Sequence, residues 1–249
     1  MEFKTTLTKP QQPFELNYGQ QILLLGSCFA ENIGALLAQH YFNIEVNPYG
    51  IIYNPMSLAS SLQEIIDRKQ YTEEDVFLYQ ELFASFNHHG KFKSTNKEEL
   101  LNEINNTIIY FNNYINNLDV LFITFGTAFV YEHIANQQVV ANCHKLPSST
   151  FNKRLLNSTE IVSTYLLLIK RLQAVRPNIK IVFTVSPVRH IKDGLIENNR
   201  SKAVLLTAVH ELVEQLDACF YFPAYELLID DLRDYRFFDS DLVHPNQLQ

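Results

Sequence analysis

The sequence lacks the features that mark membrane, secreted or nucleic-acid-binding proteins. No apolar run approaches the roughly 20 residues that a membrane-spanning helix needs. The opening MEFKTTLTKPQQPFEL has neither the apolar segment nor the small-residue cleavage site of a secretory signal. Lysine and arginine form no block, and the formal net charge is −7. We therefore expect neither nucleic acid nor an anionic membrane as a partner.

Cysteine is scarce, and its spacing disfavours a disulfide framework or a metal site. The three cysteines, Cys28, Cys143 and Cys219, form no CxxC pair. An odd number of isolated cysteines is typical of reduced thiols, so we expect a cytoplasmic protein. Cys143 precedes His144, but structural zinc needs four ligands, usually in close pairs, so we expect no metal. GxGxxG and GxxxxGK[ST] are absent, and we expect no nucleotide or other cofactor.

The sequence does contain a regular alternation of apolar runs and helical patterns. Its 249 residues are 47% hydrophobic and 19% charged, which suits a globular chain with a sizeable core. Apolar runs predict strands at 22–25, 43–46, 120–126, 180–188 and 219–222. Helical periodicity predicts helices at about 29–40, 57–68 (with Ser57 as its N-cap), 95–117, 158–175 and 198–217. This alternation predicts a single domain, residues 1–249, with a doubly wound parallel sheet and right-handed crossovers.

Three segments fall outside the alternation. The polar lead-in, residues 1–20, is compatible with an edge strand. Residues 74–91 are rich in aromatics and carry a His-His-Gly turn, which predicts an insertion that covers the sheet. Residues 129–144 alternate about a polar middle and predict a hairpin. We expect the insertion and the hairpin to line a pocket.

The stretch QILLLGSCFAENIG, residues 21–34, places small nucleophilic side chains where α/β sheets bind ligands. Its apolar run stops at Gly26, Ser27 and Cys28 follow, and the helical pattern begins at Phe29. A strand, a tight turn and a helix put these side chains at the carboxyl end of a strand, beside a helix N-terminus. A serine there is more often a helix cap, so a nucleophilic role requires a base.

The tail of the chain offers such a base. Asp241 precedes His244 by three residues, and Pro245 follows. At helical or tight-turn spacing the carboxylate can accept the Nδ1 proton and leave Nε2 free as a general base. A late strand precedes this loop, which predicts that the loop returns to the carboxyl edge beside the first turn. Ser27, His244 and Asp241 then outline a triad, and the ordinary alternative is an Asp and a His on the surface.

These segments resemble a known family. GSCFA at 26–30 matches the motif of the GSCFA family, a branch of the SGNH/GDSL hydrolase superfamily, and the similarity continues through NPYGIIYNP, TFGTAFVY, ANCHKLP, TVSPVRHIKDG, YFPAYE, LRDYRF and DLVHP. The resemblance implies a flavodoxin-like three-layer α/β/α sandwich with a mostly parallel five-stranded sheet. It also implies a serine hydrolase acting on esters, with Ser27 as nucleophile, His244 as base and Asp241 as the carboxylate. Such a chain would continue into a helix, whereas this sequence stops five residues after His244.

The oxyanion hole departs from the pattern of the superfamily. There the Ser N–H is joined by a Gly N–H and an Asn amide. Gly50 fits the glycine by its order along the chain, or it is a turn glycine that needs a positive φ. Gly126-Thr127-Ala128 stands where the superfamily has Gly-x-Asn. The replacements to consider are Thr127, Asn142 and Asn54. Loss of one donor typically costs about 10²–10³ in rate, so the departure bears on efficiency or substrate class.

Other residues carry weaker signals. Cys28 is an alternative nucleophile, but only one of two consecutive side chains can face His244, and the resemblance favours Ser27. Arg189 and His190 follow a predicted strand at the functional edge and are expected to contact substrate, although a satisfied loop histidine is the ordinary alternative. Three residues form an expected ion-pair cluster that orients the last loop, namely Arg233, Asp234 and Arg236.

The sequence thus predicts a metal-independent serine esterase that cleaves a small acyl ester, such as an acetyl group on a carbohydrate or metabolite. Its partner would be that small-molecule or carbohydrate ester. Two alternatives remain open. One is an acyltransferase in which a sugar hydroxyl replaces water. The other is a weakly catalytic ligand-binding module on the same fold, which the missing Gly-x-Asn favours and the retained triad residues disfavour.

Overall fold

The five predicted strands form one parallel sheet. A computed structural model describes residues 6–8 and 14–246 of the chain. The sheet has the order β11-β10-β6-β1-β2, and all of its pairings are parallel. Its strands are β1 (Ile22–Gly26), β2 (Ile44–Val46), β6 (Val120–Phe125), β10 (Lys180–Val185) and β11 (Cys219–Tyr221). β10 ends at Val185, within the predicted range 180–188, as expected from Pro187, which has no N–H to extend the ladder.

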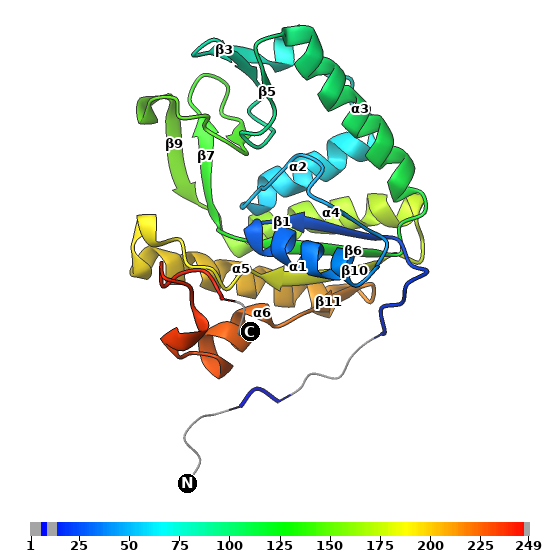
Figure 1. The fold of residues 1–249 in the computed structure, drawn as a ribbon, viewed down its shortest axis with the longest axis vertical. Coiled ribbons are helices and arrows are strands. Elements are labelled where there is room, and N and C mark those ends of the chain that lie inside the picture. The colour runs from blue at the N-terminus through cyan, green and yellow to red at the C-terminus, as the bar shows by residue number, and fades with distance from the viewer. Residues whose placement is uncertain (1–5, 9–13, 247–249) are drawn as a thin grey trace.

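Helices cover both faces of this sheet, which confirms the α/β sandwich. The long helices are α1 (Cys28–Gln39), α2 (Pro55–Ile66), α3 (Lys97–Ile115), α4 (Ser158–Val175) and α5 (Leu195–Gln215). Leu23 and Leu25 of β1 pack into the larger core with α2, α3, α4 and α5. Ile22 and Leu24 point to the other face, where α1 covers them. Because strand side chains alternate between faces, a fully apolar β1 requires a layer on each side. Figure 1 shows these layers around the sheet.

Helix α2 starts earlier than the sequence pattern suggested. Its N-cap is Asn54, whose Oδ1 accepts the Ser57 N–H at 2.8 Å, and Pro55 occupies the first turn. The prediction of Ser57 as the cap is therefore wrong by one turn. Proline suits the first helical position, and asparagine caps as well as serine does. Helix α5 likewise starts at Leu195, three residues before the predicted boundary.

The predicted insertion and the predicted hairpin each belong to a small antiparallel sheet. One contains β3 (Phe77–Tyr79), β4 (Leu82–Ala84) and β5 (Lys93–Ser94), and the other contains β7 (Phe129–His133), β8 (Val139–Val140) and β9 (Phe151–Leu155). Phe86 stacks on Phe77 at 4.1 Å between ring centroids and lies edge-on to Phe151, so aromatic contacts join the two. Figure 1 shows the small sheets side by side at the upper left. Strand β9 was not predicted.

Short elements complete the described chain. They are the 3₁₀ turns Glu73–Asp75, Ser148–Thr150, Ile191–Asp193 and Tyr235–Phe237, the short helix α6 (Ala224–Glu226) and a π-helical turn, Leu227–Asp231. Within the lead-in, residues 6–8 and 14–20 form no strand, and the remainder lies outside the described residues. Across residues 6–8 and 14–246, none of the helices combines the length and the apolar character needed to cross a bilayer.

Candidate active site

The turn after β1 has a backbone that only glycine can supply at residue 26. Gly26 has φ +137°, and a Cβ built on it would lie 2.2 Å from the Thr124 carbonyl oxygen of β6. The Gly26 N–H donates to Asn47 Oδ1 at 2.8 Å, and its carbonyl accepts the Ile52 N–H at 3.0 Å. The loop after β2 therefore binds both the N–H and the carbonyl of Gly26, and this fixes the positions of Ser27 and Cys28.

The hydroxyl of Ser27 is buried and unused. Ser27 is the N-cap residue of α1, but its side chain makes no capping hydrogen bond. Ser27 is 1% exposed, and its Oγ has no hydrogen-bond partner among the described residues. A buried polar group without a partner costs about 1–3 kcal/mol, because it loses its hydrogen bonds to water. The ordinary explanation of this serine as a helix cap therefore fails, and its hydroxyl stays available to a ligand.

The predicted pairing of Asp241 with His244 is present. Asp241 Oδ2 lies 2.6 Å from His244 Nδ1, and its Oδ1 accepts the backbone N–H groups of Val243 and His244, each at 2.9 Å. The bond from His244, helped by these two N–H groups, lowers the pKa of Asp241 to about 2. The carboxylate thus stays ionised at neutral pH and holds the imidazole with Nε2 pointing away from it.

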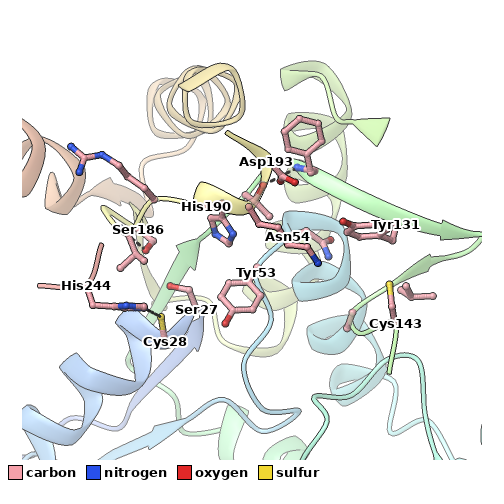
Figure 2. A pocket seen from close by; sticks show the side chains of 17 residues that line it. Ser27, Cys28, Tyr53, Asn54, Tyr131, Cys143, Ser186, His190, Asp193 and His244 are labelled. Carbon is pink, nitrogen blue, oxygen red and sulfur yellow. Dashed lines mark hydrogen bonds between the residues drawn. The ribbon is translucent and has the colours of Figure 1, made fainter. Parts of the chain in front are cut away.

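His244 Nε2 faces Cys28. The distance from Nε2 to Cys28 Sγ is 3.9 Å, drawn as a dashed line in Figure 2. Burial raises the pKa of the Cys28 thiol, although the N–H groups of Phe29 and of Cys28 itself act in the opposite direction. The thiol is therefore protonated at neutral pH, and the neighbouring imidazole is the base within reach. Of the two consecutive nucleophiles, Cys28 has its side chain against His244.

The last loop is anchored beside the first turn. Phe238 and Pro245 form an antiparallel bridge, and the Asp239 N–H donates to the His244 carbonyl at 2.7 Å. The Arg189 guanidinium lies 5.4 Å from the centre of the Phe238 ring. The first two contacts fold the closing loop (residues 238–245) onto itself, and the third joins it to the segment after β10, at the carboxyl edge of the sheet. The closing loop thus returns to the turn after β1, residues 26–28 (the opening turn), as the sequence predicted.

A cavity of about 390 Å³ opens between these segments. Ser27, Cys28 and His244 line one end of it, and Tyr131 and Cys143 line the other (Figure 2). Tyr53 and Asn54 lie between the two ends in Figure 2. The far wall comes from β7 and β8, so the predicted hairpin does contribute to the pocket. The predicted insertion, residues 74–91, contributes none of the residues that line this cavity. Pockets of 300–1,000 Å³ suit small organic ligands.

The predicted oxyanion donors divide into two pairs. Thr127 and Asn54 line the cavity, whereas Gly50 and Asn142 are not among its lining residues. The Gly50 N–H donates to the Asn47 carbonyl at 2.8 Å, and Gly50 has φ +76° in that turn. Asn142 Oδ1 accepts the His144 N–H at 2.8 Å. An oxyanion role for any of the four stays a prediction.

Thr127 and Asn54 already make other hydrogen bonds. The Thr127 N–H donates to the Tyr53 carbonyl at 3.1 Å, and its hydroxyl lies 3.0 Å from Ser201 Oγ. The Asn54 amide caps α2 and also donates to Ser57 Oγ at 3.0 Å. Each residue therefore shapes the cavity wall through contacts with a neighbouring element.

The two predicted substrate contacts also lie at the cavity. His190 and Arg189 both line it. The His190 ring lies edge-on to Tyr53 at 5.3 Å, and its backbone N–H donates to Asn198 Oδ1 at 3.0 Å. Burial lowers the pKa of His190 to about 4, so its imidazole is neutral at pH 7. A neutral imidazole offers one donor and one acceptor to a ligand.

A buried polar face of α5 supports the site, and sequence analysis missed it. Asn198, Ser201 and Lys202 are each at most 2% exposed. Lys202 Nζ donates to the carbonyls of Gly126 and Ser186, each at 2.6 Å. Gly126 directly follows β6 and Ser186 directly follows β10, so the Lys202 ammonium joins the ends of two strands. The spacing i, i+3, i+4 was the available signal, since it places all three side chains on one helix face.

Two other sequence features make contacts of their own, the Cys143-His144 pair and the expected ion-pair cluster. His144 is buried, and its Nε2 lies 2.8 Å from the Ser85 carbonyl oxygen. Within the described ranges no group of three or more His, Cys, Asp or Glu side chains could hold a metal ion. In the expected ion-pair cluster, Arg236 Nη2 lies 3.3 Å from Asp234 Oδ2, with both side chains largely exposed.

Comparison with known proteins gives a family. A search of curated proteins found no match. The sequence model of the GSCFA family matches residues 21–249. This range includes the opening turn, the cavity walls and the closing loop. This chain belongs to the GSCFA family.

Proposed function

We propose that this protein is a carboxylic ester hydrolase acting on a small acyl group in the cavity between the opening turn and the closing loop. The observation that carries the proposal is the reach of His244, held by Asp241, to within 3.9 Å of Cys28 in the opening turn. An imidazole whose Nδ1 proton is held by a carboxylate keeps the Nε2 lone pair free to accept a proton from a nucleophile.

The chemistry would follow the usual course of acyl transfer. A nucleophile from residues 27 and 28 attacks the ester carbonyl, and His244 takes its proton and passes it to the leaving alkoxide. Water then cleaves the acyl-enzyme by the same route. Ser27 is the nucleophile that the sequence predicts, and its buried, unpartnered hydroxyl supports a role at the reacting carbonyl. The resemblance to SGNH/GDSL hydrolases supports the same reaction class.

The N-terminus of α1 would stabilise the developing oxyanion. Ser27 does not cap the helix with its side chain, and the N–H groups of Ala30 and Glu31 donate to its carbonyl. The N–H groups of Cys28 and Phe29, at the very start of the helix, are the ones that would bind an anion. Such preorganised donors are commonly the largest single contribution to acyl-transfer catalysis. The cavity has room for a small-molecule ester, and the resemblance to SGNH/GDSL hydrolases favours a short acyl group, such as acetyl on a carbohydrate or metabolite.

Hydrolysis of p-nitrophenyl acetate by the wild type and His244→Ala tests the proposal. Loss of a general base typically costs about 10²–10⁴ in rate, so we expect kcat/KM to fall by that factor. His40→Ala is the matched control, because His40 is exposed at the opposite end of α1. Equal rates in the wild type and His244→Ala would remove this site from the reaction.

A further inference from the structure

We propose that the attacking atom of this site is the sulfur of Cys28, so that the enzyme forms an acyl thioester, with the Ser27 hydroxyl serving the oxyanion. This inference rests on the proposed ester hydrolysis and assigns its nucleophile. The sequence favoured Ser27 by resemblance, whereas the contacts of the two side chains favour Cys28.

The first argument is the direction of the base. His244 Nε2 has a contact with Cys28 Sγ at 3.9 Å, the range of a hydrogen bond that involves sulfur. Among the described residues no hydrogen bond joins Ser27 Oγ to any group, the imidazole included. A general base must lie within hydrogen-bond reach of the proton that it takes. Cys28 meets this condition in the resting structure, and Ser27 does not.

The second argument is the position of the sulfur at the start of a helix. Cys28 is the first residue of α1, and the N–H groups of Phe29 and Cys28 favour its thiolate. The buried Lys202 ammonium also favours the thiolate, and Glu31 opposes it. A thiol at a helix N-terminus beside a histidine is the arrangement in which cysteine acts as a nucleophile.

Burial opposes ionisation of the sulfur, so the assignment depends on His244. It raises the pKa of Cys28, so the resting thiol keeps its proton and needs His244 to remove it during attack. The isolated sulfur is therefore not a spontaneously ionised, oxidation-prone thiolate. Its reactivity depends on the imidazole, and this dependence makes the assignment testable.

Ser27 then has a separate role. Its hydroxyl is a donor without a partner, is 1% exposed and lines the same cavity as Cys28. A tetrahedral oxyanion that forms at Cys28 needs donors on the side away from His244. The Ser27 O–H can replace the Asn amide that the sequence lacks after β6.

The steps balance without any further reactant than water. The Cys28 S–H proton goes to His244 Nε2 as the sulfur bonds to the carbonyl carbon, and the carbonyl electron pair moves to oxygen. The tetrahedral species expels the alkoxide, which takes the proton from His244 and leaves the thioester. Water then gives its proton to His244, adds to the thioester and releases the acid, and the thiol regains its proton.

The linkage of the acyl group identifies the nucleophile. Wild type, Ser27→Ala, Cys28→Ala, Cys28→Ser and Cys143→Ala would be mixed with p-nitrophenyl acetate, quenched in acid during turnover and analysed by intact mass and peptide mapping. Denatured acyl-protein would then receive neutral hydroxylamine, which cleaves thioesters and leaves oxygen esters intact. Cys143→Ala shows whether Cys143, the other thiol that lines the cavity, carries any of the labile acetyl group.

We expect a hydroxylamine-labile acetyl group on Cys28 in the wild type, Ser27→Ala and Cys143→Ala. We also expect none in Cys28→Ala, a stable one on residue 28 in Cys28→Ser, and hydrolysis about 10²–10³ slower in Ser27→Ala. A stable acetyl group on Ser27 of the wild type, or Cys28→Ala turnover at the wild-type rate, overturns this inference and leaves ester hydrolysis in place. Absence of turnover in the wild type itself overturns the proposed function.

Discussion

Asp241 shows how one carboxylate can set the chemistry of a neighbouring ring. One of its oxygens accepts two backbone N–H groups, and the other meets His244 Nδ1 at 2.6 Å. The geometry of the loop thus directs Oδ1 to the backbone and Oδ2 to the imidazole. Leu242, between the pair, has φ +59°, a conformation that tightens the turn. The tautomer of His244 follows from this turn.

Asp241→Asn tests that conclusion. The amide oxygen would keep the two backbone N–H bonds, so the amide NH₂ would face Nδ1 and drive the imidazole proton to Nε2. A protonated Nε2 cannot accept the nucleophile's proton, so we expect kcat for p-nitrophenyl acetate to fall by about 10²–10⁴.

The control for this variant is Asp239→Asn, an exposed carboxylate in the same loop. We expect wild-type kcat from it, with both variants keeping the thermal unfolding temperature of the parent. A kcat for Asp241→Asn equal to that of Asp239→Asn would mean that the carboxylate does not set the tautomer.

Helix α5 supports the site through its buried polar face. Ser201 Oγ accepts the Ala128 N–H at 2.7 Å, Asn198 holds the His190 backbone, and Lys202 joins the ends of β6 and β10. Burial lowers the pKa of Lys202 to about 7. The two carbonyl acceptors favour its charged form, but loss of hydration outweighs them.

Lys202→Met gives a prediction about stability against pH. Because the pKa of Lys202 is lower in the folded chain than in the unfolded chain, the unfolded chain binds an extra proton between about pH 7 and pH 10. The free energy of unfolding of the wild type should therefore rise with pH in that window, relative to the variant, by at most about 1.4 kcal/mol per pH unit.

Urea unfolding of both proteins at pH 7, 8 and 9 measures this difference. The other titrating groups are common to the two proteins and cancel in the comparison. A difference in unfolding free energy that stays constant from pH 7 to pH 9 would show that Lys202 has an ordinary pKa in the fold.

The sequence predicted a strand correctly wherever an apolar run was the dominant pattern. β1, β6 and β10 are apolar runs with few polar residues, and burial on both faces of a sheet explains such runs. The cap of α2 was misplaced, because Asn54 and Ser57 both make good caps and only the backbone geometry chooses between them. Strand β9 was missed, because its letters FNKRL pair with β7 only through tertiary contacts.

At the site, spacing along the sequence identified the Asp241–His244 pair but did not identify the contacts that Lys202 makes with residues far away in the sequence. Asp241 and His244 lie three residues apart, so one turn brings them together. Lys202 bonds the carbonyls of residues 76 and 16 positions away, and a lysine within a helical pattern ordinarily reads as exposed. The choice between Ser27 and Cys28 depends on the direction of two neighbouring side chains, which a sequence pattern does not encode.

At the scale of the whole molecule, the turn after β1 and the loop that carries His244 meet at one edge of the sheet. Cys28 and His244 are 216 positions apart and come from the first strand turn and the last loop. The parallel order of the sheet places the carboxyl end of every strand on this edge, and Arg189, after β10, contacts the closing loop at Phe238. The fold thereby converts distant segments into one reactive pair.

A double-mutant cycle tests this joint action most directly. The measurement is kcat/KM for p-nitrophenyl acetate in the wild type, Cys28→Ala, His244→Ala and the double variant. Residues that act as one catalytic unit are strongly non-additive. We predict that each single variant loses about 10² or more and that the double variant loses no more than the worse single one. Losses that multiply in the double variant would contradict the account, since Cys28 and His244 would then act independently.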